Sequence, residues 1–327
     1  MIYLAGDIGG TKTHLALYKE EKGKIISIKD QKFSSPKYPN LKTIAKEFLK
    51  DENIEIKKGC FGIAGPVKKG KSQATNLPWL VDSEILSSEL SINKVALIND
   101  LEANAYGLNM LKKGDLYCLN QGDLSAEGNQ AMISAGTGLG EAGMYYNGKS
   151  HLPFACEGGH TDFAPRNEEE DELLRYLRKK FDHISYERVL SGPGLYNLYQ
   201  FIIDTKKERE KEDIYQEITS GDSPRLISEK GLSGESKACT KTLQLFASIY
   251  GSEAGNIALK MLALGGVYIG GGIAPKILQV IKEGTFFDSF TKKGRFSNLL
   301  KSIPIHVVLN DNTALLGATY YAKYIMY

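Results

Sequence analysis

The stretch from Val95 to Gly107 constrains the fold of this 327-residue chain more than any other. Val95 to Ile98 is a short apolar run of the kind that forms a buried strand, and Leu101 to Leu111 has the composition of a helix. The polar pair Asn99-Asp100 therefore falls where a strand gives way to a helix. Ligands bind at this edge of open α/β sheets, where a carboxylate can accept a hydroxyl proton. The alternative role for Asp100 is a plain helix cap, because Asp and Asn are preferred N-cap residues.

A glycine-rich turn near the N-terminus predicts a contact with phosphate groups. The segment Asp7-Ile-Gly-Gly-Thr-Lys-Thr13 joins two strand-like runs into a hairpin. Gly9 and Gly10 let backbone N–H groups approach an anion closely, while Thr11 and Thr13 add hydroxyl donors. Asp7 could hold a hydrated cation that bridges phosphates. An ordinary hairpin turn, which also favours Gly-Gly, is the alternative.

A second hairpin repeats this pattern later in the chain. The apolar run Ala131 to Ala135 leads into Gly136-Thr137-Gly138, and Gly140 to Tyr146 returns. Two such turns suggest an old duplication and suit a nucleotide held between two halves. A third glycine-rich turn, Gly270 to Gly272, follows a buried strand and would let a flat ligand lie against bare backbone.

Two further polar segments suggest binding of a polyol. In Glu157-Gly-Gly-His160 the carboxylate and the imidazole could chelate vicinal hydroxyls, although a hydrogen-bonded structural pair is the commoner arrangement. Glu187 stands just ahead of a Gly-Pro turn and would by itself be an ordinary surface acid. Trp79 is expected to anchor the loop Lys68–Trp79 on its domain.

Strand-like and helical runs alternate along the chain, which predicts a mainly parallel sheet with a hairpin at one side. We expect the 206–223 segment to be a variable helical or loop excursion. The other expected elements are strands Lys24–Phe33, Lys57–Ala64 and Ile305–Leu309, and helices Leu41–Lys50, Ser83–Leu90, Glu168–Lys180, Leu195–Asp204, Ser236–Leu264 (broken near Gly251) and Thr313–Tyr324.

Composition narrows the function classes. Lys and Arg total 41 against 39 Asp and Glu, a net charge of +2, and the basic residues are scattered, so no nucleic-acid surface is predicted. The four cysteines form no C-x-x-C pair, which favours a reducing cytoplasm over zinc or disulfide chemistry. The longest uncharged apolar stretch, Met261 to Pro275, is too short to span a bilayer, so no membrane contact is expected.

Taken together, these motifs resemble those of the bacterial ATP-dependent glucokinases in the sugar-kinase and actin-like ATPase superfamily. The resemblance spans nearly the whole chain, and the order of the motifs makes it more specific than any one of them. The matching segments are Asp7–Thr13, Leu97–Asp100, Ser134–Gly140, Glu157–His160, Glu187–Gly194 and Gly270–Pro275, with Asn76–Trp79 and Lys293–Phe296 as further matches.

The resemblance implies a two-lobed α/β fold of the actin-like ATPase (ribonuclease H-like) type, with mixed sheets flanked by helices and a cleft between the lobes. Residues 1–110 plus 302–327 would form the small domain and 111–301 the large one. The implied reaction phosphorylates D-glucose at its 6-hydroxyl with ATP and Mg²⁺, as the first step of glycolysis. A cytoplasmic homodimer is also implied.

Residue roles follow from the same resemblance. Asp100 would be the base for the 6-hydroxyl, and lobe closure would be needed to complete the site. Asn99, Asp100, Glu157, His160 and Glu187 would bind the sugar, Asp7 would bind Mg²⁺ through water, and Asp7, Gly9, Gly10, Thr11, Gly136, Thr137, Gly270, Gly271 and Gly272 would bind ATP.

Other functions of the same fold remain open at this stage. A kinase for mannose or an N-acetylhexosamine is the closest rival, because these sugars share most hydroxyls with glucose. A non-catalytic sugar sensor would lose Asp100, and an actin-like ATPase would lack the sugar segments. We expect no structural zinc, since no cysteine-rich stretch follows His160, and no DNA-binding domain, since Asp7 lies close to Met1.

Overall fold

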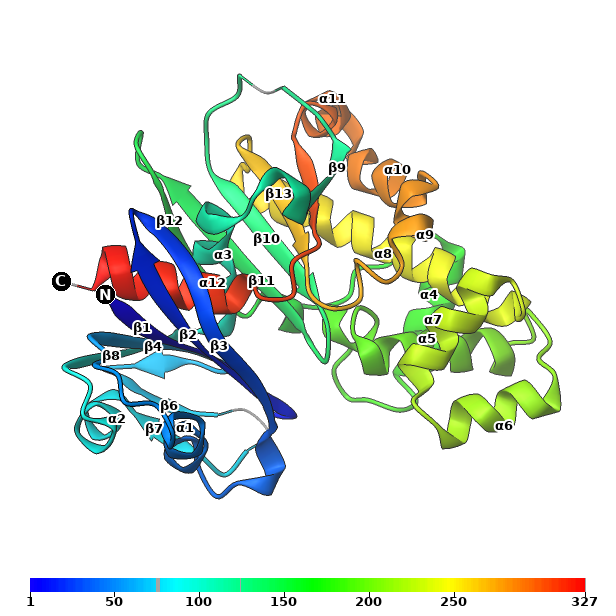
Figure 1. Cartoon of the computed structure of the whole chain (residues 1–327). Helices are drawn as coiled ribbons and strands as arrows, with labels where there is room; N and C mark the ends of the chain where they lie inside the picture. Colours follow the sequence, from blue (N-terminus) through cyan, green and yellow to red (C-terminus); the bar gives the residue numbers. More distant parts are fainter. Residues whose placement is uncertain (75–76, 124, 327) are drawn as a thin grey trace. The chain divides into compact units, whose positions relative to one another are not determined.

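Two mixed β-sheets organise the chain, which divides into two units (Figure 1). The computed structural model describes residues 1–74, 77–123 and 125–326. Met1–Lys113, Leu152–Ala155 and Asn310–Tyr327 form the first unit, and Gly114–His151 and Cys156–Leu309 form the second. Asn76, which belongs to one of the segments that resemble the glucokinases, lies outside the described residues.

The first unit is built on a five-stranded sheet in the order β3-β2-β1-β4-β8. β1 pairs with β2 antiparallel and with β4 parallel, and β4 pairs with β8 parallel. Its strands are β1 (Ile2–Ile8), β2 (Lys12–Glu21), β3 (Lys24–Ser34), β4 (Lys58–Ile63) and β8 (Lys94–Asn99), and its helices are α1 (Leu41–Leu49), α2 (Ser83–Leu90), α3 (Asp100–Gly107) and α12 (Thr313–Tyr320).

Alternation along the central strand gives this sheet two apolar faces. Leu4 and Ile8 of β1 belong to a core that also contains residues of α1 and α2, whereas Tyr3 and Ala5 belong to a core with α3 and α12. Helices therefore cover both faces, as the alternation of strands and helices predicts.

A small three-stranded sheet replaces part of the expected loop before Trp79. It consists of β5 (Val67–Lys68), β6 (Lys71–Gln73) and β7 (Leu80–Asp82). Trp79 is buried in the core of the first unit, and its indole Nε1 donates a hydrogen bond to the carbonyl oxygen of Tyr38 at 3.2 Å. The prediction that Trp79 anchors this segment is thus confirmed.

The sheet of the second unit pairs β10 with β13 and β13 with β14 in parallel, with β11 and β9 antiparallel at the sides. The full order is β12-β11-β10-β13-β14-β9. Its strands are β9 (Leu116–Asn120), β10 (Gln130–Ala135), β11 (Leu139–Tyr146), β12 (His151–Cys156, of which Leu152–Ala155 are counted with the first unit), β13 (Gly266–Gly270) and β14 (Ile305–Val308). The helices of the second unit are α4 (Glu168–Leu177), α5 (Gly192–Asp204), α6 (Glu212–Ser220), α7 (Ser223–Ser233), α8 (Lys237–Met261), α9 (Leu278–Lys282), α10 (Thr285–Thr291) and α11 (Ser297–Lys301).

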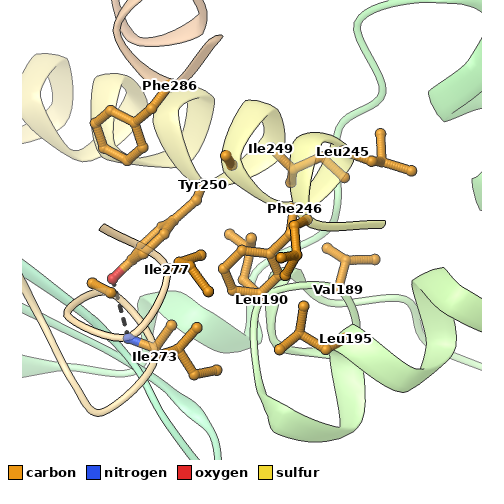
Figure 2. Packing of buried hydrophobic residues seen from close by; sticks show 14 of the residues in the cluster. Val189, Leu190, Leu195, Leu245, Phe246, Ile249, Tyr250, Ile273, Ile277 and Phe286 are labelled. Atoms are coloured by element: carbon orange, nitrogen blue, oxygen red, sulfur yellow. Dashed lines mark hydrogen bonds between the residues drawn. The ribbon is translucent and has the colours of Figure 1, made fainter. Parts of the chain in front are cut away.

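The long helix α8 runs through Gly251 without the expected break. A Cβ atom on Gly251 would come within 2.0 Å of the carbonyl oxygen of Phe286, so this glycine allows α10 to pack closely against α8. Figure 2 shows Phe286 beside Tyr250, whose side chain extends from α8. Their rings meet edge to face at 5.7 Å. Glycine has a low helix propensity, but at this position it allows two helices to pack closely.

Several boundaries differ from those expected from the sequence. α3 begins at Asp100 and ends at Gly107, followed by a 3₁₀ turn, and the 206–223 excursion contains α6 and the first residue of α7. The C-terminal part of the first unit begins at Asn310, because the preceding strand β14 pairs with β13 and so belongs to the second unit. The short helical turns are η1 (Ser35–Lys37), η2 (Leu108–Met110), η3 (Lys113–Asp115), η4 (Gly158–His160), η5 (Tyr186–Arg188), η6 (Gly294–Phe296) and the π-helical turn η7 (Tyr321–Ile325).

The crossing of α3 and α12 gives a test of the packing. A Cβ on Gly317 of α12 would lie 1.7 Å from the carbonyl oxygen of Ala103. We expect Gly317→Ala to destabilise the protein by about 1–3 kcal/mol, the usual cost of overpacking, as measured by urea unfolding. In the control Gly114→Ala the added Cβ would meet nothing within 4 Å, and stability should stay within about 0.5 kcal/mol. Equal effects of both substitutions would contradict the packing argument.

Candidate functional site

Parallel strand pairing brings two sequence-predicted acids to one edge of the first unit's sheet. Ile8 of β1 is in register with Ile63 of β4, which is in register with Asn99 of β8, so the three strands end together. Asp7 precedes Ile8, and Asp100 follows Asn99 as the first residue of α3. The two carboxyl groups are close enough to interact electrostatically. The carboxyl edge of the sheet thus holds a pair of acids, where ligands bind in α/β folds.

The helix cap at this edge is Asn99, not Asp100. Asn99 Oδ1 accepts hydrogen bonds from the backbone N–H groups of Leu101 at 2.9 Å and Glu102 at 3.3 Å. Its Nδ2 donates to the carbonyl oxygen of Gly65 at 3.3 Å. Asp100 is half-buried, and its Oδ1 accepts from Leu101 N at 3.0 Å. The plain cap considered for Asp100 is therefore the role of its neighbour, and the Asn99 oxygen is already committed to the backbone.

The environment of Asp7 favours a bound cation. Burial, and then the neighbouring charge of Asp100, raise the pKa of Asp7 to about 7. An opposite charge near the pair would relieve both effects, and carboxylate oxygens are the donors that Mg²⁺ prefers. The residues present therefore fit a hydrated Mg²⁺ beside Asp7.

Ser35 holds the first glycine-rich turn in place. Its hydroxyl donates to the carbonyl oxygen of Gly9 at 2.8 Å, and its backbone N–H donates to the carbonyl oxygen of Thr11 at 3.0 Å. Because the only Ser35 hydroxyl hydrogen is used this way, the Thr13 hydroxyl is the donor in the 2.9 Å bond between them. Thr13 is fully buried, so its expected role as a phosphate donor is wrong. Thr11 is exposed at the turn, beside the half-buried Gly10.

In the second unit, Glu187 is tied to the second glycine-rich turn. Glu187 Oε2 accepts a hydrogen bond from the backbone N–H of Leu139 at 2.9 Å. A Cβ on Gly138 would lie 2.4 Å from the same oxygen, so a larger residue at this position would displace the carboxylate. The carbonyl oxygen of Gly136 accepts from Gly192 N at 2.8 Å, which fixes the other side of the turn and leaves Thr137 exposed at its tip. Glu187, which is predicted to bind sugar, and the turn that is predicted to bind phosphate are thus joined by hydrogen bonds.

The third glycine-rich turn lies against the end of β10. Gly271 has φ +79°, and its Cβ would lie 2.2 Å from the carbonyl oxygen of Ala135, so no other residue fits without strain. Gly272 is exposed, with nothing within 4 Å of its Cβ position. The hydroxyl of Tyr250 accepts from Ala135 N at 3.2 Å and donates to the carbonyl oxygen of Gly270 at 3.3 Å. Core packing on α8 thereby aligns the ends of β10 and β13.

His160 and Glu187 line the same surface pocket of about 440 Å³ in the second unit. Glu157 is exposed and is not part of the pocket lining, although its carbonyl oxygen accepts from His160 N at 3.0 Å. Sequence reasoning missed the remaining wall of the pocket, because most of it lies in the loop after α4, which carries no motif; only Arg188 belongs to the matching segment Glu187–Gly194. The residues of this wall are Lys180, Phe181, Asp182, His183, Ser185 and Arg188.

Other classes of site find no support among the described residues. Within residues 1–74, 77–123 and 125–326, no group of three or more His, Cys, Asp or Glu side chains could hold a metal ion. The four cysteines are free thiols. No helix in the described part of the chain is long and apolar enough to cross a membrane.

Comparison with known proteins agrees with this geometry. Residues 4–325 match the glucokinase family. The glucokinase of Nostoc punctiforme is 44% identical over 332 residues, which cover 97% of each chain. The crystal structure of a glucokinase from an Antarctic psychrotroph is 30% identical and covers 98% of both chains with a TM-score of 0.83. A ROK family glucokinase from Streptomyces griseus, solved with glucose and AMPPNP, shares the fold at 18% identity, with a TM-score of 0.69 over 99% of both chains.

These solved structures confirm the predicted actin-like ATPase fold. The family match and the relatives at high coverage carry the assignment beyond fold. Together with the acids and glycine-rich turns of the two units, they show that the chain belongs to the glucokinase family.

Proposed function

We propose that this chain transfers the γ-phosphoryl group of ATP to the 6-hydroxyl of D-glucose, giving glucose 6-phosphate and ADP. Membership of the glucokinase family supports the reaction. The observation in the structure that carries it is the pair Asp7 and Asp100 at the shared carboxyl edge of β1 and β8. A sugar-binding protein without catalysis would not need two acids held together against their repulsion.

Asp100 is the proposed base. The attacking 6-hydroxyl must lose a proton as the new P–O bond forms, and a carboxylate within hydrogen-bond reach can accept it. Little basicity is needed, because phosphoryl transfer depends mainly on positioning and on neutralising charge. The hydrogen bond from Leu101 N to Asp100 Oδ1 orients the carboxylate at the start of α3.

Phosphate groups are assigned to the glycine-rich turns. Gly9, Gly10 and Thr11 would meet phosphates from the first unit and Gly136 and Thr137 from the second. Bound Mg²⁺ would neutralise phosphate charge, with Asp7 holding it through water. The adenosine is assigned to Gly270, Gly271 and Gly272; Gly271 and Gly272 are exposed and offer bare backbone to a flat ligand, whereas Gly270 is buried.

Sugar hydroxyls are assigned to Asn99, Glu157, His160 and Glu187. Glu187 has one oxygen occupied by Leu139 N, so Oε1 is the oxygen proposed to accept from a hydroxyl. His160 lines the same pocket and could donate or accept. A homodimer in a reducing cytoplasm completes the proposal; the free thiols fit the reducing compartment.

The proposal is tested by a coupled assay of ADP release over glucose, mannose, N-acetylglucosamine and N-acetylmannosamine. We expect kcat/KM to be highest for glucose. A higher kcat/KM for mannose or an N-acetylhexosamine would transfer the assignment to that sugar. No sugar-dependent ADP release would favour the non-catalytic sensor.

Asp100→Asn should lower kcat by roughly 10²–10⁴-fold, the usual contribution of a general base, because the amide cannot accept the proton. Glucose binding measured by calorimetry should stay near wild type, since Asn99 still caps α3. The control Glu84→Gln changes an exposed first-turn acid of α2 and should leave kcat unchanged. Near wild-type turnover of Asp100→Asn would refute the assignment.

Activity should require Mg²⁺, and Asp7→Asn should raise the Mg²⁺ concentration that gives half-maximal turnover, because the variant loses the charge that holds the hydrated cation. Turnover is followed during a Mg²⁺ titration at saturating ATP and glucose. Asp30→Asn, an acid elsewhere in the same sheet, serves as control. An unchanged Mg²⁺ requirement in Asp7→Asn would exclude Asp7 from the metal site.

A further inference from the structure

A buried acid lies directly beneath one of the proposed sugar-binding segments. Glu141 projects from β11 and is 2% exposed. A Cβ on Gly158 would lie 1.9 Å from Glu141 Oε2 and 3.3 Å from Glu141 Cβ, so the carboxyl group supports the backbone between Glu157 and His160. The sequence gives no reason to place a charged residue under this segment, and the proposed reaction does not use it.

A second buried acid meets the first. Glu253 of α8 is 0% exposed and lies within hydrogen-bonding reach of Glu141. Among the residues that the structure describes, no donor reaches Glu141 Oε1. Two ionised carboxylates in this position would repel each other, and the unsatisfied oxygen would cost free energy. A single proton held between the two carboxyl groups would remove the repulsion and satisfy the unpaired oxygen.

The charged and titratable groups around the pair do not supply a full counter-charge. Lys260 Nζ lies 3.4 Å from Glu253 Oε1 and is half exposed. Lys293 Nζ donates to Ser252 Oγ at 3.0 Å and to Asn256 Oδ1 at 2.5 Å, and burial lowers its pKa to about 8. The other titratable groups that interact with the pair are Cys156, Tyr186 and Tyr250, and burial raises the pKa of each.

Burial, and then the charge of Glu253, raise the pKa of Glu141 to about 8, against a smaller opposing effect of Lys260. Interacting acids of this kind titrate as a pair. At neutral pH the pair therefore retains one proton, and it becomes fully ionised only above about pH 8.

The same pair is connected to the second sugar-binding segment. Asn256 Nδ2 donates to Glu253 Oε2 at 2.6 Å and to Tyr186 Oη at 3.1 Å. Tyr186 directly precedes Glu187, and its backbone N–H donates to the carbonyl oxygen of Thr161 at 3.0 Å. The segments that carry His160 and Glu187 are thus joined to one another above a common buried support.

We propose that Glu141 and Glu253 share one proton, and that Glu141 is a positioning residue which sets the segment Glu157–His160 for sugar binding. The inference rests on the proposed function of that segment. Loss of the shared proton places two negative charges beneath Gly158 and displaces the segment. Glucose affinity therefore falls as the pH rises through about 8, whereas the protonated pair supports binding below it.

The test measures the Kd of glucose by calorimetry from pH 6.5 to 9.5 without ATP. For the wild type we expect Kd to rise roughly 30-fold between pH 7 and pH 9.5, since only the protonated pair supports binding. Glu141→Gln mimics the protonated acid, so its Kd should match that of the wild type at pH 7 and stay flat. Lys293→Arg keeps a positive charge near Glu253 but removes the other buried group that titrates near pH 8, so it should keep the wild-type profile.

A rise in Kd that persists in Glu141→Gln, or that disappears in Lys293→Arg, would overturn the proposal. Wild-type binding that does not change with pH would overturn it too, whereas no glucose binding at any pH would instead contradict the proposed function. Hydrogen exchange of the Gly158–Thr161 amides provides a measurement that needs no variant. After correction for intrinsic rates, their protection in the wild type should be lower at pH 9 than at pH 7, and equal protection would contradict the proposal.

Discussion

Parallel pairing of β1, β4 and β8 is the constraint on which the candidate chemistry depends. The shared register ends all three strands together and so brings Asp7 and the Asn99-Asp100 junction to one edge. Close approach of α3 requires glycine in the middle strand, because a Cβ on Gly62 would lie 2.8 Å from Ala103 Cβ. Burial, and then the neighbouring charge of Asp100, raise the pKa of Asp7, a cost that proteins accept mainly at functional sites.

Local patterns predicted much of this arrangement. The apolar run before Asn99 and the helical composition after Asp100 located a strand-to-helix junction, because both signals reside in neighbouring residues. Local patterns also misled. Gly251 suggested a helix break, since propensity contains no information about the approach of Phe286. The Thr13 hydroxyl was expected to donate a hydrogen bond to phosphate, but it donates to Ser35, which follows β3. Tertiary contacts decided both cases.

Contacts between side chains that lie far apart in the sequence could not be predicted from the sequence. Glu141 lies in a strand with the sequence of an ordinary hairpin arm, and Glu253 lies on a helix more than a hundred residues later. Only the packing of α8 on the sheet makes them one buried pair. The wall of the pocket beside His160 and Glu187 likewise lies mostly in a loop that carries no motif. The motifs therefore predicted candidate binding residues, but not the buried side chains that hold these residues in place.

Analysis of the reaction products is the most direct way to establish that this glucokinase-family protein phosphorylates glucose at its 6-hydroxyl. Purified protein is incubated with ATP, Mg²⁺ and ¹³C-labelled glucose, and the products are examined by ³¹P and ¹³C nuclear magnetic resonance. We expect one phosphorylated sugar, with phosphorus coupled to carbon 6, and an equal amount of ADP. Phosphorylation at another carbon, or ADP formed with free phosphate and unchanged glucose, would contradict it.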